Sequence, residues 1–140
     1  MSKIAVVFWS GTGNTEQMAY AVMEGIKEKA AEAALFAASE FGASMVKQYD
    51  AIAFGCPAMG AEVLEETEFQ PMWDACEGAL GGKKVALFGS YGWGDGEWMR
   101  DWEETCKRAG AELVCDSVIC NDAPGEEALS ACKELGGALN

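Results

Sequence analysis

Short apolar runs alternate along this chain with longer segments that are apolar on one side only. Residues 4–9, 51–54 and 85–88 are continuous apolar runs without polar alternation. Such runs are typical of parallel strands that are covered by helices on both faces of a sheet. The pattern therefore predicts three central strands.

Two further segments are weaker strand candidates. Residues 32–37 are rich in alanine, which has a poor strand propensity. In residues 113–120, Asp116 and Ser117 interrupt the apolar positions. We expect both segments to be edge strands.

Four stripes of apolar residues at helical spacing lie between or after the strand candidates. They are Met18, Val22 and Ile26; Phe69, Trp73, Cys76 and Leu80; Trp98, Trp102, Cys106 and Ala109; and Ala128, Cys132, Leu135 and Leu139. Strands that alternate with helices predict an α/β fold with a doubly wound, five-stranded parallel sheet. The loops after its strands are the expected functional loops, here residues 10–15, 56–66 and 89–98. A chain of 140 residues is too short for two ordinary domains, so we expect a single domain over residues 1–140.

The first loop looks suited to an anion. Its small polar side chains are Ser10, Thr12, Asn14 and Thr15. Free amides at the start of a helix favour a phosphate. A dinucleotide fingerprint would need glycine at position 16, which is Glu16, and no Gly-Lys-Ser/Thr of a Walker loop occurs. The other interpretation is a tight turn between strand and helix, capped by Asn14 with Gln17 three residues later.

The third loop places Tyr91 and Trp93 between glycines after a buried strand. Neighbouring glycines cannot cover these rings, so a planar ligand ring is one explanation of the pattern. The other explanation is a loop that folds its own aromatic side chains onto the protein surface. Trp98 differs, because it begins a helical stripe and is expected in the core.

The composition limits the compartment and the partners. Twenty-three acidic and ten basic residues give a net charge of -13, which argues against nucleic acids and membranes and favours basic protein partners. Without histidine, a Ser-His-Asp triad, a Cys-His pair and histidine-containing zinc sites are excluded.

The six cysteines include no CxxC pair, which indicates buried thiols in a reducing compartment. With neither a signal peptide nor an apolar run long enough to span a bilayer, a cytoplasmic location is expected.

Taken together, the three loops resemble those of short-chain flavodoxins, which are small electron carriers that contain FMN. The matching segments are WSGTGNTE at residues 9–16, GCPAMG and EVLE within residues 55–65, and KKVALFGSYGWGDGEWM at residues 83–99. The resemblance covers essentially the whole chain. It implies FMN as the cofactor and the flavodoxin-like strand order 2-1-3-4-5, for which flavodoxin is itself a standard example.

The resemblance also implies roles for individual residues. The FMN phosphate would be bound by the loop of Ser10, Gly11, Thr12, Gly13, Asn14 and Thr15, with Trp9 beside it. Met59 would cover the inner face of the isoalloxazine ring, Trp93 would stack on its outer face, and Glu62 would accept from the flavin N3–H. The ribityl chain and the ring would be lined by Ser90, Tyr91, Gly92 and Gly94. Asn121 would approach the pyrimidine edge.

The turn that contains Pro57, Ala58, Gly60 and Ala61 would complete the site. Because glycine lacks a Cβ, the Gly60 peptide could flip so that its carbonyl accepts from N5–H of the neutral semiquinone. Pro57 stands where some relatives place a phosphate-contacting serine, which would remove one phosphate contact. Ala61 stands where some relatives have an acidic or hydroxyl side chain, which would shift the potentials modestly.

The function implied is that of a low-potential carrier, which shuttles single electrons between redox proteins through the semiquinone/hydroquinone couple of FMN. No substrate would be turned over, so neither a catalytic residue nor a metal is expected. The surrounding acids and the uncharged phosphate loop would disfavour the anionic hydroquinone. We expect a monomer whose redox partner proteins have basic docking surfaces. The alternative is an FMN-dependent NAD(P)H or quinone reductase of related fold, although an acidic rim would repel an anionic nicotinamide cofactor.

Overall fold

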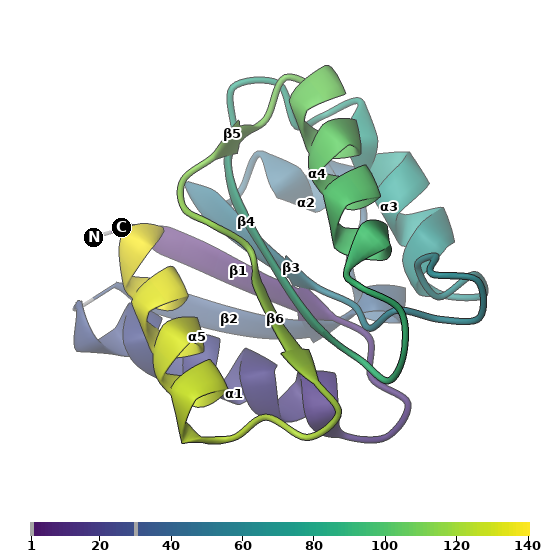
Figure 1. Cartoon of the computed structure of the whole chain (residues 1–140). Helices are drawn as coiled ribbons and strands as arrows, with labels where there is room; N and C mark the ends of the chain where they lie inside the picture. Colours follow the sequence, from purple (N-terminus) through teal and green to yellow (C-terminus); the bar gives the residue numbers. More distant parts are fainter. Residues whose placement is uncertain (1, 30) are drawn as a thin grey trace.

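The computed structural model describes residues 2–29 and 31–140, which form one parallel sheet between two layers of helices (Figure 1). The strands are β1 (Lys3–Phe8), β2 (Glu32–Ala37), β3 (Ala51–Gly55), β4 (Lys84–Tyr91), β5 (Glu112–Leu113) and β6 (Val118–Asn121). Their order is β2-β1-β3-β4-β5, with β6 also paired to β4. The predicted α/β class and the order 2-1-3-4-5 are confirmed.

The last edge of the sheet differs from the prediction of one strand over residues 113–120. That segment forms two short strands, so the sheet has six strands rather than five. β5 pairs with the first residues of β4, and β6 pairs with its last four residues. The interruption lies at the polar residues Asp116 and Ser117, and the Ser117 hydroxyl donates to Glu103 Oε2 at 2.6 Å. This bond joins the interruption to α4.

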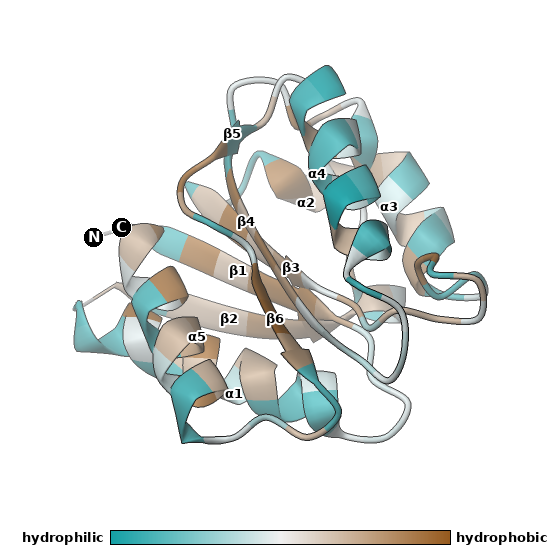
Figure 2. Ribbon diagram, in the orientation of Figure 1, coloured by the Kyte–Doolittle hydropathy of each residue, from teal (hydrophilic) through white to brown (hydrophobic). Residues whose placement is uncertain are grey.

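Helices cover both faces of the sheet. They are α1 (Asn14–Glu28), α2 (Ala43–Val46), α3 (Phe69–Glu77), α4 (Glu97–Arg108) and α5 (Glu126–Ala138), together with the 3-10 turn η1 (Ala38–Glu40). α1 and α5 lie on one face and α3 and α4 on the other (Figure 1). In Figure 2 the strands are largely hydrophobic and the outer surface of α4 is hydrophilic, as its predicted stripe requires.

The two faces bury different cores. Under α3 and α4 the core holds Trp73, Trp98 and Trp102, and the rings of Trp73 and Trp102 meet edge to face with centroids 5.7 Å apart. Under α1 and α5 the core is mostly aliphatic. There the two helices approach closely at Gly25, where a Cβ would lie 1.9 Å from the Lys133 carbonyl oxygen. Both faces of the sheet are therefore covered by closely packed helices.

The thiols behave as the sequence predicts. All six cysteines are free, and Cys56, Cys76, Cys106 and Cys132 are buried. Burial raises the pKa of Cys56 to about 12, so that thiol is neutral at ordinary pH. Within residues 2–29 and 31–140, no group of three or more acidic or cysteine side chains is placed so that it could hold a metal ion. No helix in the same ranges is long and apolar enough to cross a membrane.

Candidate functional site

The three candidate loops meet at the carboxyl ends of β1, β3 and β4, where they line a cleft of about 220 Å³. Its lining residues are Trp9, Ser10, Gly11, Thr12, Asn14, Thr15, Pro57, Ala58, Met59, Ser90, Tyr91, Gly92 and Asp122. The structure thus brings together residues that are up to 113 positions apart, from Trp9 to Asp122. The other expected site residues do not line this cleft; they are Gly13, Gly60, Ala61, Glu62, Trp93, Gly94 and Asn121.

Ser10 shapes the first loop from within. Its hydroxyl oxygen accepts from the Gly13 N–H at 3.1 Å and from the Glu16 N–H at 3.3 Å. Gly13 precedes α1 with a φ of 97°, a left-handed conformation that favours glycine. Asn14 is the first residue of the helix and makes no capping bond, so the interpretation of Asn14 as a cap is wrong. The loop is closed by Ser10 instead.

Several amides of this loop remain available. Within the described part of the chain, the N–H groups of Gly11, Thr12, Asn14 and Thr15 have no acceptor. They lie at the start of α1, where the helix dipole favours a negative charge. Uncharged N–H and hydroxyl donors of this kind fit the phosphate of FMN.

Buried hydroxyls tie the first loop to β4. Thr15 and Ser90 are both buried, their hydroxyl oxygens lie 3.2 Å apart, and the Ser90 N–H donates to Thr15 Oγ1 at 3.4 Å. Trp9, which precedes this loop, is held by Glu68, because its indole N–H donates to Glu68 Oε1 at 3.0 Å. A Cβ on Gly11 would lie 3.0 Å from the Trp9 ring, so the loop passes close over that indole.

Two apolar side chains at this edge of the sheet are uncovered. Trp93 is 64% exposed and Met59 is 36% exposed, which is unusual for large apolar groups. Tyr91 behaves differently, because its ring packs against Trp98 with centroids 5.5 Å apart. Of the two explanations of the glycine-flanked aromatics, the self-covered one therefore applies to Tyr91, whereas Trp93 is left free to stack on a planar ring.

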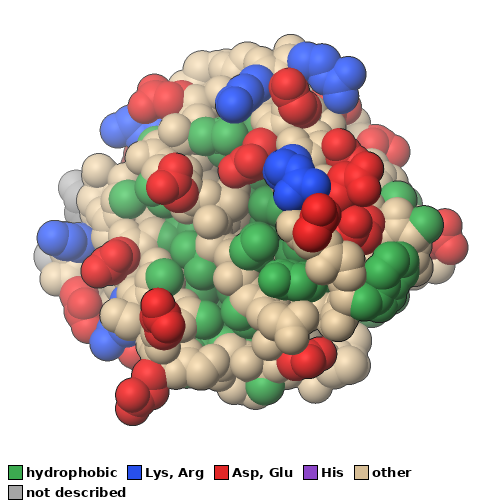
Figure 3. Space-filling model, in the orientation of Figure 1, with side chains coloured by type: hydrophobic (Ala, Val, Ile, Leu, Met, Phe, Trp, Pro, Cys, Tyr) green, Lys and Arg blue, Asp and Glu red, His purple; other side chains and the backbone are tan. Residues whose placement is uncertain are grey.

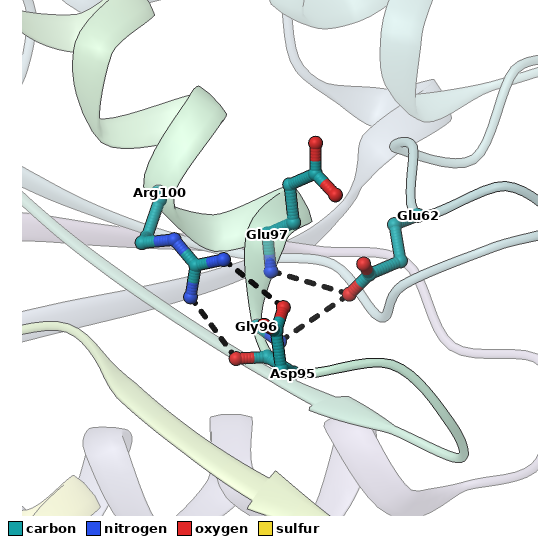
Figure 4. A network of polar contacts seen from close by, with 5 residues as sticks. All are labelled: Glu62, Asp95, Gly96, Glu97 and Arg100. Carbon is teal, nitrogen blue, oxygen red and sulfur yellow. Dashed lines mark hydrogen bonds and ion pairs between the residues drawn. The ribbon is translucent and has the colours of Figure 1, made fainter.

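A short hairpin carries Glu62 toward α4. It is closed by two bonds between Met59 and Val63, at 2.8 and 3.0 Å, and both Gly60 and Glu62 have positive φ, 46° and 54°. Glu62 Oε1 accepts from the N–H groups of Gly96 and Glu97 at 3.3 and 3.2 Å (Figure 4). The carboxylate expected to face the flavin N3–H thus also caps the start of α4.

Asp122 was not expected in the site. It follows β6 with a φ of 56°, and its N–H donates to the Tyr91 carbonyl at 2.8 Å. The Asn121 side-chain amide donates to the same carbonyl at 3.2 Å. An Asn-Asp pair at the end of the last strand is a turn signal, and this could have identified Asp122 as a residue of the functional edge.

Glu65 supports the site and was not singled out in the sequence analysis. Its buried carboxylate accepts from the N–H groups of Thr67, Glu68 and Phe69 at 2.8 Å each, and from the Thr67 hydroxyl. Burial alone would raise the pKa of Glu65, but these bonds outweigh burial and lower it from 4.5 to about 2. Glu65 therefore fixes the segment between the Met59–Val63 hairpin and α3.

We expect Glu65→Gln to lower the free energy of unfolding by about 1 kcal/mol near neutral pH, because a helix-start cap becomes neutral. The folded pKa lies below the ordinary value, so the carboxylate stabilises the fold above pH 4.5 and this contribution is lost as the pH falls toward 2. Urea unfolding of both proteins at several pH values checks this. A difference that stays constant over that range would contradict the assigned role.

The chain is similar to known proteins over nearly its full length. The family model described as Flavodoxin matches residues 6–136. The flavodoxin of Clostridium beijerinckii is 45% identical over 131 residues, which cover 94% of each chain, and that of Megasphaera elsdenii is 40% identical over 135 residues, which cover 96% of each chain. The solution structure of two-electron reduced Megasphaera elsdenii flavodoxin superposes with a TM-score of 0.90 at 41% identity, covering 97% of both chains. The chain therefore belongs to the flavodoxins, the FMN-binding electron carriers.

Proposed function

We propose that this chain is a low-potential one-electron carrier that binds FMN in the cleft of residues 9–15, 57–59 and 90–92, with the ring between Met59 and Trp93. The observation that carries the proposal is the set of free amides at the start of α1, next to an uncovered indole at the same sheet edge. FMN supplies the chemistry, because its ring takes up and releases electrons one at a time. The chain's own residues bind it, orient it and set the surrounding charge.

The phosphate loop is assigned to residues 10–15. Its donors are amides and hydroxyls without a positive charge, so a bound phosphate dianion keeps its negative charge. Glu62 and Asp122 add further negative charge around the remaining loops. Adding an electron near this charge is unfavourable, which is the physical basis of the proposed low potential.

Protein partners with basic docking surfaces fit the outside of the molecule. The net charge is -13, and Figure 3 shows acidic side chains spread over the face that carries β6, α4 and α5. The same charge would repel an anionic nicotinamide cofactor, which favours a carrier over the NAD(P)H reductase alternative. The described elements pack on one sheet, which supports a single domain. A monomer is also part of the proposal. A cytoplasmic location is included because the six cysteines are free.

Thr12→Ala tests the phosphate site. The exposed Thr12 hydroxyl is assigned to the phosphate, so its loss should weaken FMN binding by about 1.5 kcal/mol, the lower end for a bond to a charged group. Riboflavin lacks the phosphate, and its affinity should stay unchanged. Quenching of flavin fluorescence measures both affinities. Thr105→Ala, on α4 outside the cleft, is the matched control, and equal losses for FMN and riboflavin in Thr12→Ala would place the phosphate elsewhere.

A further inference from the structure

Arg100 lies on α4, one turn after the point where Glu62 caps the helix. Its guanidinium donates from Nη1 to the Asp95 carbonyl oxygen and from Nη2 to Asp95 Oδ1, both at 3.0 Å (Figure 4). These two bonds hold the residue that immediately precedes Gly96 and the helix. The planar fork of arginine can satisfy both acceptors at once.

The two interactions share one peptide group. The Asp95 carbonyl that accepts from Arg100 and the Gly96 N–H that donates to Glu62 belong to the same planar unit. Rotation of that plane would break the bond to Arg100 and the bond to Glu62 together. A cation on the carbonyl also polarises the peptide and strengthens the N–H as a donor.

The conformation of Glu62 is also restricted by its own backbone and by Gly94. Its φ of 54° is uncommon for a residue with a side chain, and a Cβ on Gly94 would lie 2.5 Å from its carboxyl group. Gly96 is itself left-handed, with a φ of 93°. The position of the Glu62 carboxylate therefore depends on the Asp95–Gly96 turn, which Arg100 holds at its far side.

We propose that Arg100 is a positioning residue for the flavin site, which holds the Asp95–Gly96 peptide and thereby places the Glu62 carboxylate at the edge of the ring. The proposal rests on the proposed location of FMN between Met59 and Trp93. The ion pair alone would not have this effect. The side chains of Arg100 and Asp95 are 60% and 79% exposed, and such surface pairs contribute little stability.

Arg100→Lys isolates positioning from charge, because lysine keeps the charge and loses the planar fork. We expect Arg100→Lys to weaken FMN binding about tenfold, which corresponds to the loss of one hydrogen bond to a charged group. Both one-electron potentials should shift in the same direction as in Glu62→Gln. In the Glu62→Gln background, Arg100→Lys should change the affinity less than about twofold, because the two residues act as a unit. Arg108→Lys, the same substitution at the other end of α4, should leave affinity and potentials unchanged.

Two results on FMN affinity would overturn the proposal. One is an equal loss of affinity from Arg100→Lys with Glu62 present and with Glu62→Gln, because Arg100 would then act independently. The other is an FMN affinity that Arg100→Lys leaves unchanged, both with Glu62 present and with Glu62→Gln. Hydrogen exchange of the Gly96 and Glu97 amides in FMN-free protein gives a readout that needs no cofactor, and it should be faster in Arg100→Lys. Unchanged exchange would refute the clamp itself, whereas wild-type protein that takes up no FMN would refute the proposed function instead.

Discussion

Trp93→Ala should weaken FMN binding by about 1–3 kcal/mol, the range for an aromatic side chain that stacks on a base. Trp98→Ala, five positions along, should instead lower the free energy of unfolding by about 3–5 kcal/mol. The contrast follows from burial, since Trp93 is 64% exposed and Trp98 is 1% exposed. The Trp98 indole also donates to the Cys56 carbonyl oxygen at 3.1 Å, which joins α4 to the end of β3.

Flavin fluorescence titration and urea unfolding separate the two effects. Trp93→Phe is the matched control, because it keeps a ring at the same position and should retain part of the affinity. Trp98→Phe keeps most of the buried volume if Trp98→Ala fails to fold. Unchanged FMN affinity in Trp93→Ala would remove that residue from the site.

Gly60→Val should lower the first one-electron potential of bound FMN. Gly60 has a φ of 46°, and nothing lies within 4 Å of a Cβ placed there, so a clash does not arise and the backbone conformation is the cause. A β-branched residue is especially unfavourable at positive φ, and the cost is about 2 kcal/mol. If the Gly60 carbonyl accepts a hydrogen bond from the flavin N5–H only after the first electron, the part of this cost that is specific to that state lowers the potential, by up to about 85 mV.

Potentiometry of the wild type and the variant measures this shift. Gly42→Val is a matched control, because Gly42 is also in open space but has an extended backbone, with a φ of -152°. Ala61→Gly, in the same turn, should leave the potential unchanged or slightly raised. A first potential that is equal within error in Gly60→Val and in the wild type would refute the role of this carbonyl.

Local patterns predicted most of the fold. The continuous apolar runs became β1, β3 and β4, and the alanine-rich segment became β2 at the edge of the sheet. The predicted ends of the strands were less accurate, because pairing with neighbouring strands decides where a strand ends. β4 continues to Tyr91, beyond its apolar run, since β6 pairs with its last residues. Leu80 lies beyond the end of α3 but is still buried.

In the site too, features set by neighbouring residues could be predicted, and contacts between distant residues could not. Glycines and small polar residues after β1 indicated an anion loop, because that chemistry is local in sequence. The contact of Glu62 with the start of α4 joins residues 34 positions apart through two left-handed residues, and no local pattern encodes such a contact. The capping role of Glu65 was hidden for a different reason. Acidic residues crowd that segment, and only burial distinguishes this one.

Stepwise reduction of the FMN-loaded protein, followed by visible spectroscopy against a redox electrode, tests the central claim most directly. The account predicts one FMN per chain and two separate one-electron steps, with the second step at a potential below that of free FMN. A protein that takes up no FMN, or one whose FMN accepts both electrons in a single step, would contradict it.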